Sequence, residues 1–224
     1  MNSKAVTLAA IGCASIIVSA VVAGTPIDLS TSNLNTRPGR LTALRAGATY
    51  QASAFPLALR VTAPDDTWAG TQWTTSSRGR RAFGWVAFGR GQPNKPPLGL
   101  VEIETAFGTT PTVSTILGRL RTAGGGATFG ATARVTVAGR PAWQIDGRVY
   151  GRFGHAFVPF TPKTGGASPP DTYKLSPGEA FRLVVADVKG KRVVLIFDSA
   201  ALPADQFPTF LDSAGRLLRS LQLG

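Results

Sequence analysis

Alternating apolar and polar positions dominate the chain from residue 55 onward. Leu57, Leu59 and Val61 alternate with small or polar residues, which is the pattern of a strand with one buried face. Further apolar stretches predict strands at 71–75, 82–88, 98–107, 131–137, 142–150, 180–188 and 193–198. Short segments rich in glycine and basic residues join neighbouring strands two by two, as turns do in β-hairpins.

Two segments instead follow the period of an α-helix. Apolar residues of the first share one face at i, i+3, i+4 and i+7 spacing: Val113, Ile116, Leu117 and Leu120. We expect Thr110 to cap this helix, Pro111 to occupy its first position and the glycines at 124–126 to end it. A second amphipathic helix is predicted from about 203 to 221, with Pro208 in its first turns, where a missing N–H costs little.

The order of these elements predicts the fold class. Four strands, a helix, four strands and a final helix show no regular alternation of strand and helix. Such an order favours an α+β domain with an antiparallel sheet of about six to eight strands, packed by two or more helices. We place this single domain at residues 53–222.

The N-terminus has the layout of a secretory signal. Lys4 supplies one positive charge, residues 5–24 carry none, and Val21-Val22-Ala23 provides a cleavage site. We therefore expect a signal peptide at 1–23 and an extracytoplasmic mature protein. Two alternatives stay open: a retained N-terminal anchor, because the apolar run is nearly long enough to span a bilayer, and a lipoprotein attached through Cys13.

Between this segment and the domain, residues 24–52 are polar and lack a sustained period. The stretch predicts a flexible stalk. Cys13 is the chain's single cysteine, so the mature protein would have no disulfide, no thiolate nucleophile and no cysteine-ligated metal.

The chain is strongly basic, with a net charge of +12. Such a protein is drawn to polyanions. Outside the cytoplasm these are anionic lipids or acidic wall polymers, and the compartment excludes nucleic acid. A solvated basic surface that only keeps the protein soluble remains an alternative reading of the same charge.

Three short patterns carry a resemblance to known proteins. They are the opening segment 55–68, the hairpin Val135-Thr136-Val137-Ala138-Gly139-Arg140-Pro141-Ala142, and the segment 175–194 with Ser176-Pro177-Gly178-Glu179 and Lys189-Gly190-Lys191. Together they resemble a group of exported actinobacterial proteins whose domain is similar to the PsbP-like fold. The resemblance covers about residues 53–222. It implies an antiparallel sheet sandwiched by helices and used for binding or assembly, and it carries no catalytic residue onto this chain.

Catalytic groups are sparse. His155 is the single histidine, and no Gly-x-Ser-x-Gly elbow exists to present a serine nucleophile. Glu102 and Glu104 lie two apart on a predicted strand and point to the same face, where we interpret them as a solvent-facing pair. One histidine and no mature cysteine cannot build an ordinary transition-metal centre. We predict no cofactor and no metal.

Two features suit binding. Arg78, Arg80 and Arg81 share a turn flanked by Trp73 and Trp85. Arginine forks match phosphate and carboxylate groups, and tryptophan is enriched at interfaces. The alternative is an ordinary solvated turn between core-facing tryptophans.

The second feature is the segment 151–177, which is rich in glycine, proline and aromatic residues and includes Arg152 and His155. Loops of such length within a compact domain are often functional. A disordered insertion is the competing interpretation.

These observations give two hypotheses of function. The first is a non-enzymatic binding or accessory protein of the cell envelope, whose basic surface contacts anionic lipid, wall polymer or an envelope protein. The alternative is an envelope hydrolase that uses His155 or the Glu102/Glu104 pair.

Overall fold

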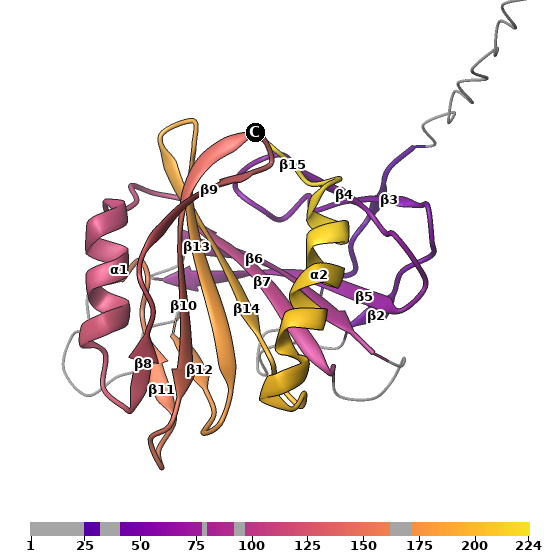
Figure 1. Cartoon of the computed structure of the whole chain (residues 1–224). Helices are drawn as coiled ribbons and strands as arrows, with labels where there is room; N and C mark the ends of the chain where they lie inside the picture. Colours follow the sequence, from indigo (N-terminus) through magenta and orange to yellow (C-terminus); the bar gives the residue numbers. More distant parts are fainter. Residues whose placement is uncertain (1–24, 32–40, 78–79, 92–96, 162–171) are drawn as a thin grey trace, which may run out of the picture.

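An antiparallel sheet forms the centre of the molecule (Figure 1). The computed structural model describes residues 25–31, 41–77, 80–91, 97–161 and 172–224. The large sheet has nine strands in the order β2-β5-β6-β7-β14-β13-β10-β8, and β9 pairs with β10. Its strands are β2 (Thr42–Ala43), β5 (Trp68–Ser77), β6 (Arg80–Arg90), β7 (Gly99–Ala106), β8 (Ala127–Phe129), β9 (Ala133–Val137), β10 (Arg140–Val149), β13 (Ala180–Val188) and β14 (Lys191–Asp198). The predicted α+β class is confirmed.

Two-residue turns set the register of the hairpins. Ala138 and Gly139 join β9 to β10, and Lys189 and Gly190 join β13 to β14; all four have positive φ, between 49° and 79°. Turns of this type match the right-handed twist of the flanking strands. The register of β13 and β14 follows, with Val185 opposite Val194.

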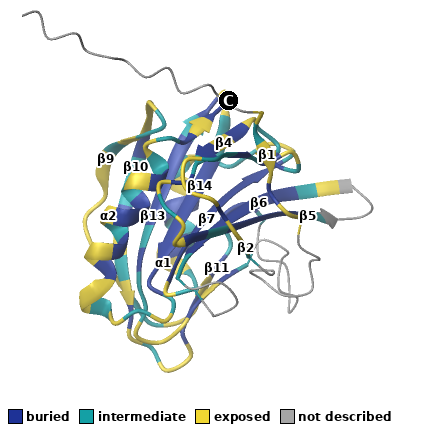
Figure 2. Ribbon diagram, turned by 90° about the vertical axis from the view of Figure 1, so that its right-hand side faces the viewer, coloured by how far each residue is buried: buried dark blue, intermediate teal, exposed yellow. Residues whose placement is uncertain are grey.

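Different elements cover the two faces of the sheet. Helix α2 (Phe207–Leu218) and a small sheet lie over one face, and helix α1 (Val113–Thr122) with the hairpin of β11 (His155–Phe157) and β12 (Tyr173–Leu175) lies over the other. The small sheet consists of β1 (Ile27–Asp28), β3 (Thr49–Gln51), β4 (Leu59–Thr62) and β15 (Gln222–Leu223). The central strands are therefore buried on both faces (Figure 2).

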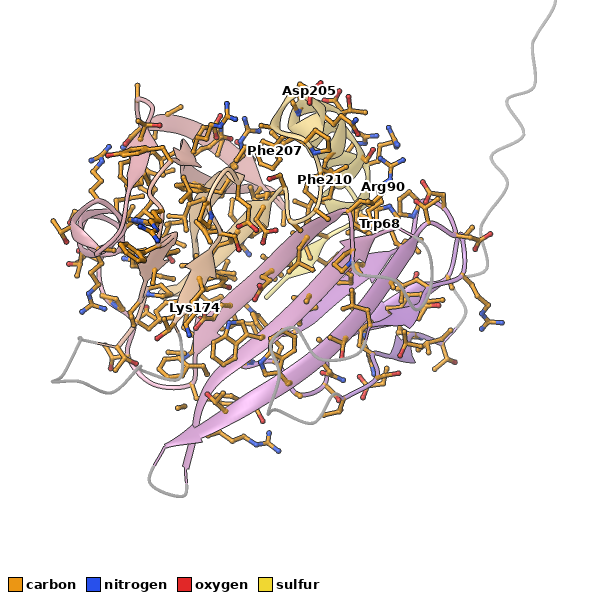
Figure 3. The ribbon with its side chains drawn as sticks, turned by 90° about the horizontal axis from the view of Figure 1, so that it is seen from below. Trp68, Arg90, Lys174, Asp205, Phe207 and Phe210 are labelled. Atoms are coloured by element: carbon orange, nitrogen blue, oxygen red, sulfur yellow. The ribbon has the colours of Figure 1, made fainter. Side chains whose placement is uncertain are left out.

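Aromatic packing fixes helix α2 on the sheet. Phe210 is 1% exposed and its ring centroid lies 6.3 Å from that of Trp68 on β5 (Figure 3). Gly99 lies directly under this ring, because a Cβ there would overlap it. A short 3₁₀ turn (Ala204–Gln206) precedes the helix, and Pro208 lies in its first turn as predicted.

The N-cap of helix α1 lies two residues later than expected. The Oγ1 of Thr112, not of Thr110, accepts the N–H of Thr115 at 3.2 Å. Thr110 instead accepts the backbone N–H of Arg192 through its Oγ1 at 2.9 Å. The prediction of the cap was wrong because two threonines flank Pro111 and the sequence pattern alone does not distinguish them.

The expected flexible stalk at 24–52 is also wrong for the parts that the structure describes. Strand β3 pairs with β4, placing Tyr50 opposite Val61, and β1 pairs in parallel with β3. Leu29, Leu44 and Tyr50 are buried in the core beneath α2. The domain therefore begins well before residue 53, and single apolar anchors rather than a periodic pattern tie this segment down.

The glycine-rich segment 151–177 contributes to the core. Its two ends form the β11–β12 hairpin, in which Phe157 and Tyr173 stack with ring centroids 5.4 Å apart. Residues 162–171 lie outside the described part of the chain. The described ends of the segment therefore pack on the sheet as a hairpin. For these residues the interpretation as a disordered insertion was wrong.

The predicted signal peptide at 1–23 lies outside the described residues. Within the described residues, no helix is both long and apolar enough to cross a membrane.

Candidate functional site

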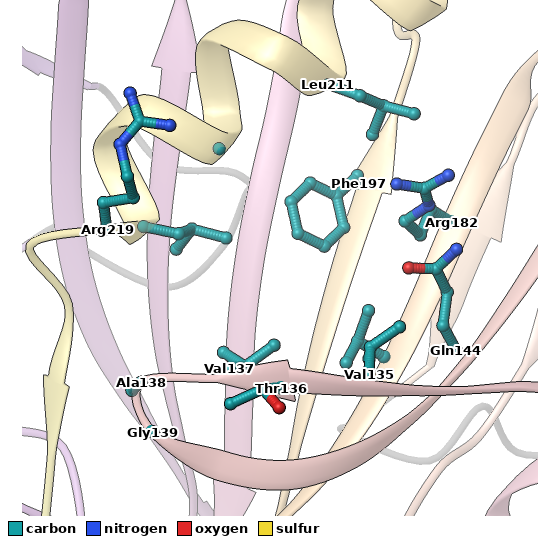
Figure 4. Close-up of a pocket in the computed structure, with 13 residues that line it drawn as sticks. Val135, Thr136, Val137, Ala138, Gly139, Gln144, Arg182, Phe197, Leu211 and Arg219 are labelled. Carbon is teal, nitrogen blue, oxygen red and sulfur yellow. The ribbon is translucent and has the colours of Figure 1, made fainter.

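A groove opens between helix α2 and the β9–β10 hairpin, above the middle of the sheet (Figure 4). Its volume is about 390 Å³, which falls within the usual range for small-molecule sites. The walls come from three elements far apart in the sequence: Val135 and Val137 on β9, Phe197 on β14, and Leu211 and Leu218 on α2. The groove therefore has apolar walls and a solvent-open mouth.

The local structure explains why the groove stays open. In the described part of the chain, strand β9 pairs with β10 alone, at the edge of the sheet, and the hairpin lines the groove opposite α2. Gly215 faces the groove from α2, and a Cβ at this position would meet no atom within 4 Å. A larger residue at 215 would fill the space that the glycine leaves.

Polar groups line one side of the groove. The guanidinium of Arg182 donates from Nε and from an Nη to the two carboxylate oxygens of Asp146, at 2.7 and 2.8 Å. The amide of Gln144 lies beside the same guanidinium, and in the orientation that turns its oxygen toward Arg182 it accepts from Nε at 3.1 Å. This ion pair holds Arg182 in place, so its remaining N–H groups present a fixed edge to the groove.

Arg219 provides a second positive charge at the end of α2. It is exposed, lines the groove, and has no carboxylate within ion-pair distance among the described residues. Arg140 follows the hairpin turn that forms the other wall. An anionic group at this end of the groove would therefore be stabilised by Arg219.

The two tryptophans of the predicted arginine and tryptophan site are buried in the structure. Trp73 and Trp85 are 2% and 0% exposed and stack with ring centroids 5.8 Å apart, so they belong to the core. Arg81 is exposed, and its guanidinium lies 5.9 Å from the ring centroid of Phe107. Arg78 and the side chain of Arg80 lie outside the described part of the chain.

Arg152 and His155 point to different environments although they are three residues apart. Arg152 is exposed, whereas His155 is 2% exposed and stacks on Phe181. The Nε2 of His155 lies 3.0 Å from the carbonyl oxygen of Leu120, which joins the β11 strand to α1. Burial lowers the pKa of His155, so the neutral imidazole is the form that packs here.

The interpretation of Glu102 and Glu104 as a solvent-facing pair is wrong. They are 5% and 0% exposed, because strand β7 lies between β6 and β14 and both of its faces are covered. They do share a face, as the spacing predicted, and Glu104 lies opposite Trp85. Neither residue lines the groove at α2 or the second described cavity, beside Phe210.

Sequence reasoning missed a third acidic side chain on this face. Asp198 ends strand β14, and its pKa is raised well above the ordinary value, first by burial and then by the charges of Glu102 and Glu179. The sequence signal was an aspartate that directly ends the apolar run Val193–Phe197. Within the described residues, no group of three or more histidine, cysteine or acidic side chains is placed to hold a metal ion.

The raised pKa of Asp198 predicts a pH-dependent stability. A carboxyl group whose pKa is higher in the folded than in the unfolded state destabilises the fold as pH rises from the ordinary value through the raised one. Asp198→Asn mimics the protonated form, so we expect it to increase the free energy of unfolding at neutral pH and to have little effect in acid. Urea unfolding at both pH values checks this, and a variant less stable than the wild type at neutral pH would contradict it.

The solved structures that match this chain include LpqN and a cyanobacterial PsbP. The crystal structure of LpqN, a protein involved in cell envelope biogenesis of Mycobacterium tuberculosis, has 17% identity and a TM-score of 0.40, and the match covers 78% of this chain and 90% of LpqN. The solution structure of cyanobacterial PsbP (CyanoP) from Synechocystis has 10% identity and a TM-score of 0.43, and the match covers 81% of this chain and 94% of that protein.

The second of these structures is a PsbP, whose fold the sequence patterns of this chain resemble. Both TM-scores lie below 0.5 and both identities below 25%, so the two likenesses concern the course of the chain and say nothing about its ligand. No family model matches the chain, and no curated protein matches its sequence.

Proposed function

We propose that this chain is a non-enzymatic binding protein of the cell envelope. In this proposal the groove between α2 and the β9–β10 hairpin takes the apolar chain of an amphiphile, whose anionic head lies against Arg219. The observation that carries it is the combination of apolar walls with two arginines on the rim of one groove. The basic chain and the signal-like N-terminus support an extracytoplasmic location.

The polar rim distinguishes an amphiphile from a purely apolar ligand. Arg182 already forms an ion pair with Asp146, whereas Arg219 has no acidic partner among the residues described. A purely apolar ligand would make no use of the exposed Arg219 charge, while a phosphate or carboxylate would form a charge-assisted hydrogen bond with it. The hydrolase alternative has less support, because His155, Glu102 and Glu104 are buried and line neither described cavity.

Binding of dodecyl phosphate to the purified full chain tests the proposal. Gly215→Leu should fill the groove and weaken the affinity at least about tenfold, equivalent to about 1.4 kcal/mol. The change should not disrupt the helix, because leucine favours a helix interior by up to about 1 kcal/mol over glycine. Isothermal titration calorimetry measures the affinity, and thermal unfolding verifies the fold.

Gly118→Leu is the matched control. Gly118 lies within α1, on the opposite face of the sheet, and a Cβ there would also meet no atom within 4 Å. The control variant should bind dodecyl phosphate like the wild type. Equal affinity of wild type and Gly215→Leu would show that the groove is not the binding site.

A further inference from the structure

The turn between β10 and β11 carries the two most exposed large hydrophobic side chains of the described residues. Tyr150 is 70% exposed and Phe153 is 93% exposed. They lie three residues apart in the sequence Tyr150-Gly151-Arg152-Phe153. We call these four residues the aromatic tip. Aromatic side chains exposed to this extent lose little apolar burial if they are changed, so the packing of the domain does not account for them.

Backbone hydrogen bonds hold the aromatic tip in one conformation. The N–H groups of Tyr150 and Gly151 both donate to the carbonyl of Gly126, at 2.9 and 3.1 Å, and Gly126 donates to the carbonyl of Gly154 at 3.3 Å. The backbones of Gly126 and Gly151 approach so closely that a Cβ on either would overlap the other. The tip is therefore braced against the segment that leaves helix α1.

The charges around the tip are mainly positive. The guanidinium of Arg152 lies 5.7 Å from the ring centroid of Phe153, and Arg148 is exposed just before the tip on β10. Lys174, exposed on β12 opposite Ala156, adds a third cation (Figure 3). The nearby carboxylate of Glu179 is half-buried and accepts the backbone N–H of Ser176.

The tip forms one end of the molecule (Figure 1). Strand β10 begins at Arg140, which lies close to the C-terminal Gly224, and ends at Val149, directly before the tip. Nine residue steps of a strand span roughly 30 Å. The tip can thus meet a flat surface without interference from the chain end or from the groove at α2.

We infer that the aromatic tip is a membrane-contact element that places Phe153 and Tyr150 in the interface of an anionic bilayer. Aromatic rings prefer the headgroup region of a membrane, and arginine and lysine near an anionic surface strengthen attachment. A protein partner fits less well, because a stable interface needs about 800 Å² on each side, far more than two side chains on a narrow turn provide. This inference is independent of the ligand proposed for the groove.

An indole placed at the tip tests the inference directly. The full-length Phe153→Trp variant is mixed with vesicles of phosphatidylcholine and phosphatidylglycerol that carry a nitroxide-labelled lipid. When vesicles are added, we expect the emission of the introduced indole to shift to shorter wavelength and the labelled lipid to quench it. The wild type, which has no indole at position 153, should not show these changes. In vesicles of phosphatidylcholine alone the binding should be weaker, by about fivefold for each cation that contacts the surface.

Two controls separate the tip from the rest of the chain. Gln222→Trp places an exposed indole at the opposite end of the domain, and it should remain unquenched. The double variant Tyr150→Ala, Phe153→Ala should bind anionic vesicles at least about tenfold more weakly while unfolding at the same temperature. Unchanged emission of the indole introduced by Phe153→Trp, or equal quenching of the indole introduced by Gln222→Trp, would overturn the inference.

Discussion

Phe210→Ala is expected to lower the free energy of unfolding by about 3–5 kcal/mol, the range found for buried phenylalanines. The ring is 1% exposed and packs against Trp68 and Phe207. It also lies over Gly99, which has no side chain to fill the space that the ring would leave. Removing the ring leaves a cavity beneath α2 that the rigid sheet cannot close. Urea unfolding followed by circular dichroism measures the loss.

Phe153→Ala makes the same chemical change on a ring that is 93% exposed. It should alter the free energy of unfolding by less than about 0.5 kcal/mol, as surface substitutions usually do. Similar losses for both variants would show that α2 is not anchored through Phe210. The pair therefore isolates the contribution of burial from that of phenylalanine itself.

Gly125→Ala should destabilise the domain by about 3 kcal/mol or more. Gly125 has φ +115°, which side chains rarely adopt, and a Cβ there would overlap the carbonyl oxygen of Gly154. Both the backbone strain and the overlap cost about 1–3 kcal/mol each. The substitution should also loosen the segment that braces the aromatic tip, which faster amide hydrogen exchange at residues 150–156 would reveal.

Gly139→Ala separates the cost of backbone strain from the cost of steric overlap. Gly139 also has a positive φ, +71°, but a Cβ there would meet no atom within 4 Å. The control should therefore lose only about 1–2 kcal/mol, the strain of a left-handed residue. If both variants were equally stable, close packing at Gly125 would not be the reason for the glycine.

The strands and helices could be predicted because the hydrophobic period reports which side of an element is buried. The same period could not show how many layers cover a face. Glu102 and Glu104 read as a polar face because charged residues are seldom buried, and only the position of β7 between β6 and β14 reveals their burial. Thr49–Gln51 was missed as a strand because three residues are too few to show a period.

The candidate groove was even harder to predict from the sequence. Val135, Leu211 and Gly215 are ordinary residues of a strand and a helix, and only the tertiary packing brings them around one space. The predicted binding residues were selected by chemical type, which placed Trp73, Trp85 and His155 in a site although they belong to the core. Arg152, in contrast, is exposed.

The small sheet joins segments from the two ends of the domain, and this has a consequence for the order in which the domain folds. Strand β15 (Gln222–Leu223) pairs with β4, where Gln222 lies opposite Arg60, and β1 is in the same sheet. The Oγ of Ser220 also accepts the N–H of Thr62. Contacts so distant in sequence form late, because the loop between them must close first. The small sheet can therefore be completed only when residues 220–223 have reached β4, so the two parts of the domain depend on each other for stability.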